Sequence, residues 1–297
     1  MSAIDVRNLS KHYGDLQAND DLTFTVDEGE VFGYLGPNGA GKTTTIRTLM
    51  GFQSPTSGTA TLLGHDVRDE SELIAAKRHV GFLPSDPAFD ETVTGRRILD
   101  LHASLKGDSR REELLADFDP PLDRPVREYS SGNVQKLGIV QAFMHDPDLV
   151  VLDEPTSGLD PLMQQRFNEL VRAERDAGTT VFFSSHVLSE VRRVCDRVAI
   201  LRGGELVATE SIEDLLDRSG KFVRARVGSA VDVAAVDVPG VHDVEASRSD
   251  GETDLTFTFT GDVSDLVAWL GTLDLHDVSV EEAPLEDVFA RFYGGEV

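Results

Sequence analysis

The chain has 297 residues, enough to bury a full α/β core and still carry a smaller second domain. It contains 53 Asp and Glu residues against 28 Lys and Arg residues, which gives a formal net charge of −25. This balance argues against nucleic acid as a partner, because binding a phosphate backbone requires a basic surface.

The acidic residues are scattered along the chain, and only six of the basic residues are lysines. This pattern resembles that of proteins from cells with molar internal salt, where charges on a dense carboxylate surface are strongly screened. We therefore expect a halophilic protein.

Membrane segments and disulfides are not expected. No run of about 18 apolar residues occurs, and the segment from Met1 to Asp5 lacks the basic and apolar regions of a signal peptide. The single cysteine, Cys195, excludes an internal disulfide and suits a reducing cytoplasm. We interpret it as a small buried apolar residue.

Within the first two thirds of the chain, the pattern of apolar residues changes twice. Residues 3–63 have the character of strands and turns, and the alternation of Leu22, Phe24 and Val26 with polar residues is typical of a half-buried strand. Residues 92–146 then carry apolar residues at helical spacing, which predicts an inserted helical subdomain. Three short apolar segments follow, at 148–155, 179–186 and 196–204, as expected of parallel strands buried on both faces.

Another change occurs near residues 218–220. The segments 221–227, 241–247 and 253–260 alternate strictly, 263–273 has helical spacing, and 276–284 again resembles a strand. This order predicts a small α+β domain at 221–297, of the β-α-β-β-α-β or ferredoxin-like type, with a terminal helix over 285–295. No catalytic constellation is visible in it.

A phosphate-binding loop lies at residues 36–43, where GPNGAGKT matches G-x-x-x-x-G-K-[ST] in full. The apolar strand VFGYL precedes it and the helical segment TTTIRTLMG follows. Glycines let the backbone approach the phosphates, Lys42 supplies a positive charge, and Thr43 supplies a hydroxyl ligand for Mg²⁺. The candidate residues of this loop are Gly36, Pro37, Asn38, Gly39, Ala40, Gly41, Lys42, Thr43 and Thr44.

Two adjacent acids end the apolar segment LVVLDEPTSGLD at 149–160. Side chains alternate at a strand end, so Asp153 and Glu154 are expected to point different ways. Asp153 would hold Mg²⁺, directly or through water, and Glu154 would polarise the water that attacks the γ-phosphate. The alternative is a pair of acids at an ordinary strand exit.

With these motifs in place, residues 2–215 resemble the nucleotide-binding subunit of an ATP-binding cassette (ABC) transporter. The resemblance implies an α/β fold, a P-loop NTPase ABC cassette with a RecA-like core, an antiparallel β subdomain and a helical subdomain at about 92–146. It places the cassette at 1–217, before the small C-terminal domain, and implies ATP and Mg²⁺ as ligands.

The segment YSSGN at 129–133 stands where the family has its signature sequence. Its first and last letters depart from the common L-S-G-G-Q, and Ser131 replaces the first glycine. Read alone, the segment is a helix N-cap. The resemblance implies that it binds the γ-phosphate of ATP held by a second copy, through Ser130, Ser131, Gly132 and Asn133.

Further positions transfer from the family. Tyr13 resembles the aromatic residue that stacks on adenine, Asp160 the residue that ties the two copies together, and His186 the histidine that senses the γ-phosphate. Ser85 stands where the family usually has glutamine. Because a serine hydroxyl reaches Mg²⁺ poorly, we expect Ser85 to act as a metal ligand through water.

The C-terminal segment EEAPLEDVF at 281–289 resembles that of ATPase subunits paired with ABC-2-type permeases, which are mostly exporters. The resemblance implies head-to-tail dimerisation driven by ATP, a separate integral membrane permease, and a cytoplasmic position on the inner face of the membrane. An importer ATPase would differ only in its partner.

Two other classes remain as alternatives. A soluble DNA-maintenance or ribosome-acting ATPase of the same superfamily would predict long heptads, zinc-binding cysteines or two cassettes. A nucleotide-gated regulatory module would predict the loss of Glu154 or His186.

Overall fold

The structure, a computed structural model, describes residues 1–228, 238–249 and 251–282 of the chain. The chain divides into two compact units, Met1–Glu210 and Ser211–Val297. Helix α8 (Ile212–Ser219) therefore belongs to the second unit, whereas the sequence suggested a boundary between residues 217 and 221.

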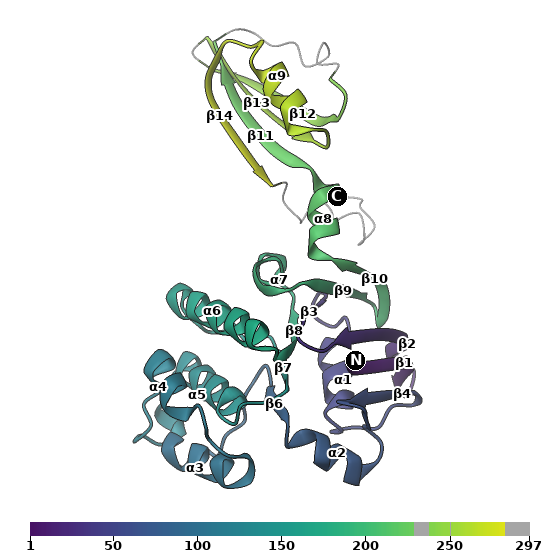
Figure 1. The fold of residues 1–297 in the computed structure, drawn as a ribbon, viewed down its shortest axis with the longest axis vertical. Coiled ribbons are helices and arrows are strands. Elements are labelled where there is room, and N and C mark those ends of the chain that lie inside the picture. Colours follow the sequence, from purple (N-terminus) through teal and green to yellow (C-terminus); the bar gives the residue numbers. More distant parts are fainter. Residues whose placement is uncertain (229–237, 250, 283–297) are drawn as a thin grey trace. The chain divides into compact units, whose positions relative to one another are not determined.

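A six-stranded sheet with the order β10-β9-β3-β8-β7-β6 forms the centre of the first unit (Figure 1). Strand β3 is parallel to both β8 and β9, and β7 is parallel to both β8 and β6. Every residue of β3, β7 and β8 is buried, as expected where helices or a second sheet cover both faces. The strands are β3 (Val31–Leu35), β6 (Val80–Leu83), β7 (Leu149–Asp153), β8 (Thr180–Ser185), β9 (Arg197–Arg202) and β10 (Glu205–Ser211).

A second, antiparallel sheet has the order β2-β1-β4-β5 and shares a core with the first. The predicted alternation of Leu22, Phe24 and Val26 is confirmed, since all three side chains are buried. The ring of Phe24 lies 5.8 Å from that of Phe32 and 6.1 Å from that of Phe182, which joins the two sheets. The strands are β1 (Ser2–Tyr13), β2 (Leu16–Asp27), β4 (Ser57–Leu62) and β5 (His65–Asp66).

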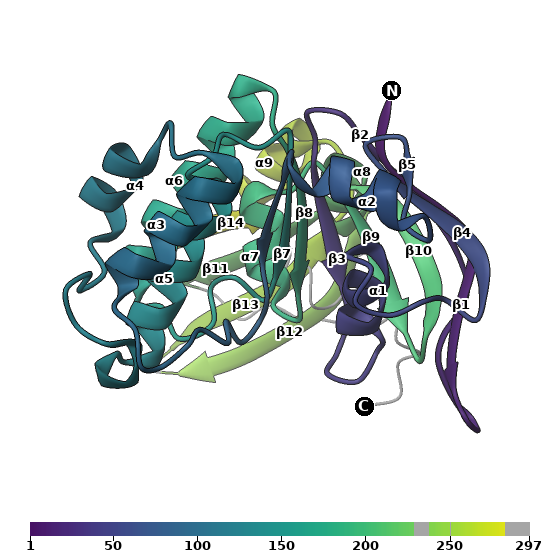
Figure 2. The same cartoon turned by 90° about the horizontal axis from the view of Figure 1, so that it is seen from below.

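Helices lie on both sides of the parallel strands (Figures 1 and 2). Helix α1 (Lys42–Leu49) lies on the side of the antiparallel sheet, next to α2 (Glu70–Lys77) in sequence. Helices α6 (Pro161–Ala177) and α7 (Leu188–Val194) connect the later strands of the parallel sheet.

The segment 92–146, expected to be helical, contains three α-helices and one 3₁₀ turn. It lies on the opposite side of the parallel strands from α1 in both views (Figures 1 and 2). Its elements are α3 (Gly95–Lys106), α4 (Arg111–Phe118), η1 (Val126–Glu128) and α5 (Ser131–Phe143).

Two histidines pack against each other within this helical segment. The rings of His102 and His145 lie 5.3 Å apart, centroid to centroid. Burial, with the nearby Lys106 ammonium as the second cause, lowers the pKa of His102 to about 4 and that of His145 to about 3. Lys106 donates a hydrogen bond of 2.7 Å to the carbonyl of Val80, so this lysine links α3 to the edge strand β6.

The second unit contains a four-stranded antiparallel sheet with the order β12-β13-β11-β14. Helix α9 (Val263–Leu270) buries Leu266 and Leu270 in a core with Phe257 and Phe259. The sequence predicts a helix between the first two strands and a terminal helix over 285–295. The first lies largely, and the second wholly, outside the described part of the chain. The ferredoxin-like fold therefore stays a prediction. The strands are β11 (Lys221–Val227), β12 (Val241–Ser249), β13 (Glu252–Phe259) and β14 (Leu275–Glu282).

None of the helices among the described residues combines the length and the apolar character needed to cross a lipid bilayer.

His102 and His145 make stability depend on pH, because their surroundings lower their pKa values. An unfolded histidine binds a proton near pH 6.5, whereas His102 and His145 stay neutral until about pH 4 and about pH 3. Between the folded and unfolded pKa values, these two histidines bind more protons in the unfolded chain than in the folded one. The free energy of unfolding should therefore fall as the pH decreases from 6.5 toward 4. Denaturant titrations across this range should show a shallower pH dependence for His145→Leu than for the wild type. Equal slopes would contradict this account.

Candidate nucleotide-binding site

The phosphate loop runs from the end of β3 to the start of α1 and is tightly held on one side. A Cβ atom at Gly36 would lie 2.6 Å from the carbonyl oxygen of Leu201, and one at Gly41 would lie 2.3 Å from that of Ala18. Gly41 also has φ 106°, and Gly39 has φ 83°, angles that favour glycine. At Gly39 a Cβ would meet nothing within 4 Å, so the loop is open at this residue.

Lys42, the first residue of α1, is only 6% exposed. Its ammonium donates to the carbonyl oxygens of Gly36 at 2.6 Å and Pro37 at 3.3 Å. It also forms an ion pair with Oε1 of Glu154 at 3.2 Å. A buried ammonium needs such partners, and together they hold the charge inside the loop, where it suits bound phosphates.

Asp153 ends β7 and is 2% exposed. Its Oδ2 accepts a hydrogen bond of 2.9 Å from the Thr43 hydroxyl, and its Oδ1 accepts one of 2.6 Å from Ser184. A hydroxyl and a carboxylate side by side form a hard oxygen donor set. The residues present therefore fit Mg²⁺ at this point.

Glu154 follows Asp153 and has a left-handed backbone conformation, with φ 51°. Besides the Lys42 contact, its Oε2 lies 2.8 Å from Nδ1 of His186. The two adjacent carboxylates thus have different partners. Asp153 accepts from Thr43 and Ser184. Glu154 contacts Lys42 and His186. Different orientations are what the alternation at a strand end predicts.

A pocket of about 410 Å³ opens over the loop. It brings together Tyr13, residues of the phosphate loop, Ser85 and Glu154. Tyr13 is 46% exposed, and the Lys11 ammonium lies 5.1 Å from its ring centroid. The lining residues are Tyr13, Leu16, Gln17, Ala18, Pro37, Asn38, Gly39, Gly41, Lys42, Thr43, Thr44, Ser85 and Glu154.

Asp153 and His186 do not line this pocket, and each is linked to it through one lining residue, Thr43 for Asp153 and Glu154 for His186.

The YSSGN segment does not line this pocket. Ser130 caps α5 by accepting a hydrogen bond of 3.3 Å from the Asn133 amide, and both Ser130 and Ser131 are exposed. Helix α5 lies apart from α1 in both views (Figures 1 and 2). Asp160 is likewise exposed and caps α6 through the Met163 amide at 3.0 Å. One copy of the chain therefore does not bring these residues to its own phosphate loop.

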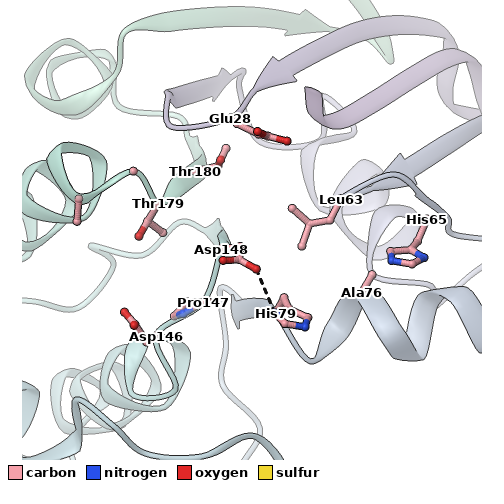
Figure 3. A pocket seen from close by; sticks show the side chains of 12 residues that line it. Glu28, Leu63, His65, Ala76, His79, Asp146, Pro147, Asp148, Thr179 and Thr180 are labelled. Carbon is pink, nitrogen blue, oxygen red and sulfur yellow. Dashed lines mark ion pairs between the residues drawn. The ribbon is translucent and has the colours of Figure 1, made fainter. Parts of the chain in front are cut away.

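A larger cavity, of about 590 Å³, lies elsewhere in the first unit (Figure 3). Asp148 and Thr180 line it at the amino ends of β7 and β8, and Asp148 pairs with His79 at 3.0 Å. In parallel α/β sheets, ligands bind at the carboxyl ends of the strands. This cavity is at the other end, so its size does not make it the nucleotide site.

Sequence analysis missed Ser184, which holds the second oxygen of Asp153. It stands beside Asp153 in the parallel pairing of β7 and β8. The order of these strands is not readable from one sequence, so the contact could be found only once their pairing was known.

Comparison with known proteins gives the family. The family model described as ABC transporter matches residues 19–157. The Nod factor export ATP-binding protein I of Sinorhizobium fredii is 34% identical over 309 residues, covering 99% of this chain and 87% of that protein. The bacitracin transport ATP-binding protein of Enterococcus faecalis is 31% identical over 301 residues, covering 98% and 96%.

An uncharacterized ABC transporter ATP-binding protein of Nostoc sp. is 42% identical over 210 residues, and the chain spans 62% of its length. A solved ATP-binding subunit of an ABC transporter has a TM-score of 0.67 and 31% identity over 73% of this chain and 93% of that one. The chain therefore belongs to the ATP-binding subunits of ABC transporters, which are ATPases. The expected P-loop ABC cassette fold is confirmed for the first unit.

Proposed function

We propose that the chain powers export through a separate ABC-2-type membrane permease, and that ATP drives two copies into a head-to-tail dimer. The proposed dimer rests on one observation. The phosphate loop and Glu154 line one pocket, whereas Ser131 is exposed on a different helix of the same copy. A second copy can supply its signature segment, Ser130 to Asn133, to the open side of this pocket, with Asp160 at the contact between the copies.

Within each copy we assign the nucleotide contacts as follows. Amides of the loop and the Lys42 ammonium bind the phosphates, and the Tyr13 ring stacks on adenine. Thr43 and Asp153 would hold Mg²⁺, and Ser85 would act through water. When bound, Mg²⁺ neutralises phosphate charge.

Hydrolysis requires a group that orients and polarises water next to the γ-phosphate. Glu154 suits this role because it lines the pocket and its Oε2 is oriented by Nδ1 of His186 at 2.8 Å. Since His186 is half exposed, it can also contact the γ-phosphate directly once the second copy closes over it.

The permease partner is supported by an apolar groove in the helical segment. A cavity of about 430 Å³ lies between α3 and the loop that follows Ser85, lined by Phe89, Val93 and Ile98 among others. On its rim, Leu101 and Leu105 are 64% and 71% exposed. Because the Ser85 loop touches both this groove and the nucleotide pocket, a membrane protein docked here would respond to nucleotide. The protein would then lie on the inner face of the membrane.

Export as the direction is supported by a relative over almost the whole chain, which is described as an export ATP-binding protein.

Replacing Glu154 with glutamine tests the proposed hydrolysis. Glu154→Gln keeps the shape of the side chain but weakens its pull on a water proton, so ATP binding should persist while turnover falls by about a hundredfold or more. The variant should also accumulate as an ATP-bound dimer, visible by light scattering after gel filtration in molar KCl. Turnover near the wild-type rate would contradict the role of Glu154, and a monomer at saturating ATP would contradict the dimer.

Replacing Leu105 with aspartate tests the partner surface. A charge on the groove rim opposes burial against an apolar partner, so Leu105→Asp should keep the ATPase activity of the isolated chain but no longer co-purify with a membrane protein. Ile74→Asp is the matched control, because Ile74 is a 53% exposed aliphatic residue on α2. Equal recovery of the membrane protein with both variants would argue against this docking surface.

A further inference from the structure

Glu190 on α7 receives hydrogen bonds from two buried hydroxyl groups. Its Oε1 accepts from Thr156 at 2.6 Å, and its Oε2 accepts from Ser185 at 2.7 Å. Thr156 is 4% exposed and Ser185 is fully buried. Hydrogen bonds to an ionised carboxylate are among the strongest in proteins, so Glu190 fixes both hydroxyls firmly.

The two hydroxyls belong to the two segments that carry the proposed catalytic pair. Thr156 lies two residues after Glu154, and Ser185 directly precedes His186. Oε2 of Glu154 and Nδ1 of His186 themselves lie 2.8 Å apart. A single carboxylate therefore bridges the backbone segments on which this contact depends.

The turn after Glu154 needs such support. Glu154 has φ 51°, and a non-glycine residue in this region carries strain that the surrounding structure must hold. Gln135 of α5 holds the turn from another side, because its Nε2 donates to the carbonyl of Pro155 at 2.7 Å. Glu190 and Gln135 thus hold neighbouring residues of one strained turn.

We propose that Glu190 is a positioning residue for ATP hydrolysis, which sets the geometry between Glu154 and His186. Glu190 does not line the nucleotide pocket, so it acts on these residues and not on the nucleotide. The inference rests on the proposed function, since it assumes that Glu154 orients the attacking water. Small misplacements of a catalytic group reduce turnover strongly while leaving substrate binding intact.

The test compares steady-state ATP hydrolysis by the full chain with that of Glu190→Ala and Glu190→Gln. Glu190→Ala loses both hydrogen bonds, so its kcat should fall by about tenfold or more while KM for ATP stays within about threefold. Glu190→Gln keeps the shape and one acceptor oxygen, and should retain more activity than Glu190→Ala.

Thermal unfolding separates positioning from simple loss of structure. The proposal expects Tm values close to that of the wild type for the Glu190 variants. Glu169→Gln is the control for charge, because Glu169 lies exposed on α6 and pairs only with Gln165 among the described contacts. A kcat within twofold of the wild type for Glu190→Ala would overturn the proposal, as would a loss of activity that follows the loss of folded protein.

Glu154→Gln in the same assay distinguishes the two possible failures. If Glu154→Gln hydrolyses ATP normally, the proposed function fails. If it is inactive while Glu190→Ala is unaffected, only the role of Glu190 fails.

Discussion

Lys42 is only 6% exposed, and the arrangement of the site depends on how its ammonium group is held. Burying an ammonium group is unfavourable unless it is paired. Two loop carbonyls and the Glu154 carboxylate supply the partners. This contact brings the start of α1 against the end of β7, and the Thr43–Asp153 hydrogen bond joins the same two elements. The phosphate loop and the two carboxylates are therefore held together by direct contacts.

The end of β7 is also tied to the rest of the first unit. Ser184 of the neighbouring strand β8 donates a hydrogen bond to Asp153, and His186, which directly follows that strand, contacts Glu154. Gln135 connects the turn to α5, the helix that begins at Ser131 in the YSSGN segment. A displacement of α5 would thus reach the turn beside Glu154 directly. By this linkage, contact of the proposed second copy with α5 would affect the orientation of Glu154, the proposed catalytic carboxylate.

Much of the nucleotide site could be predicted from sequence, because many of its residues are neighbours in the chain. Glycine spacing defines the loop at 36–43, and the adjacent acids at 153 and 154 end a strand whose apolar run marks it as buried. Contacts between distant segments could not be predicted in this way. Neither Ser184 beside Asp153 nor Glu190 between Thr156 and Ser185 has a sequence signal, since each depends on strand order and on the packing of α7. The short strands β5 and β6 were also missed, because four residues or fewer carry no clear periodicity. The halophilic character inferred from composition stays a prediction.

Mixing two inactive variants tests most directly whether two copies complete each site. Lys42→Ala removes the charge of the phosphate loop but keeps the signature segment, and Ser131→Glu places a carboxylate in that segment but keeps the loop. Each variant alone should be inactive. Random pairing gives half mixed dimers with one intact site each, so the mixture should regain about a quarter of the wild-type ATPase activity. A mixture no more active than its separate components would contradict the account.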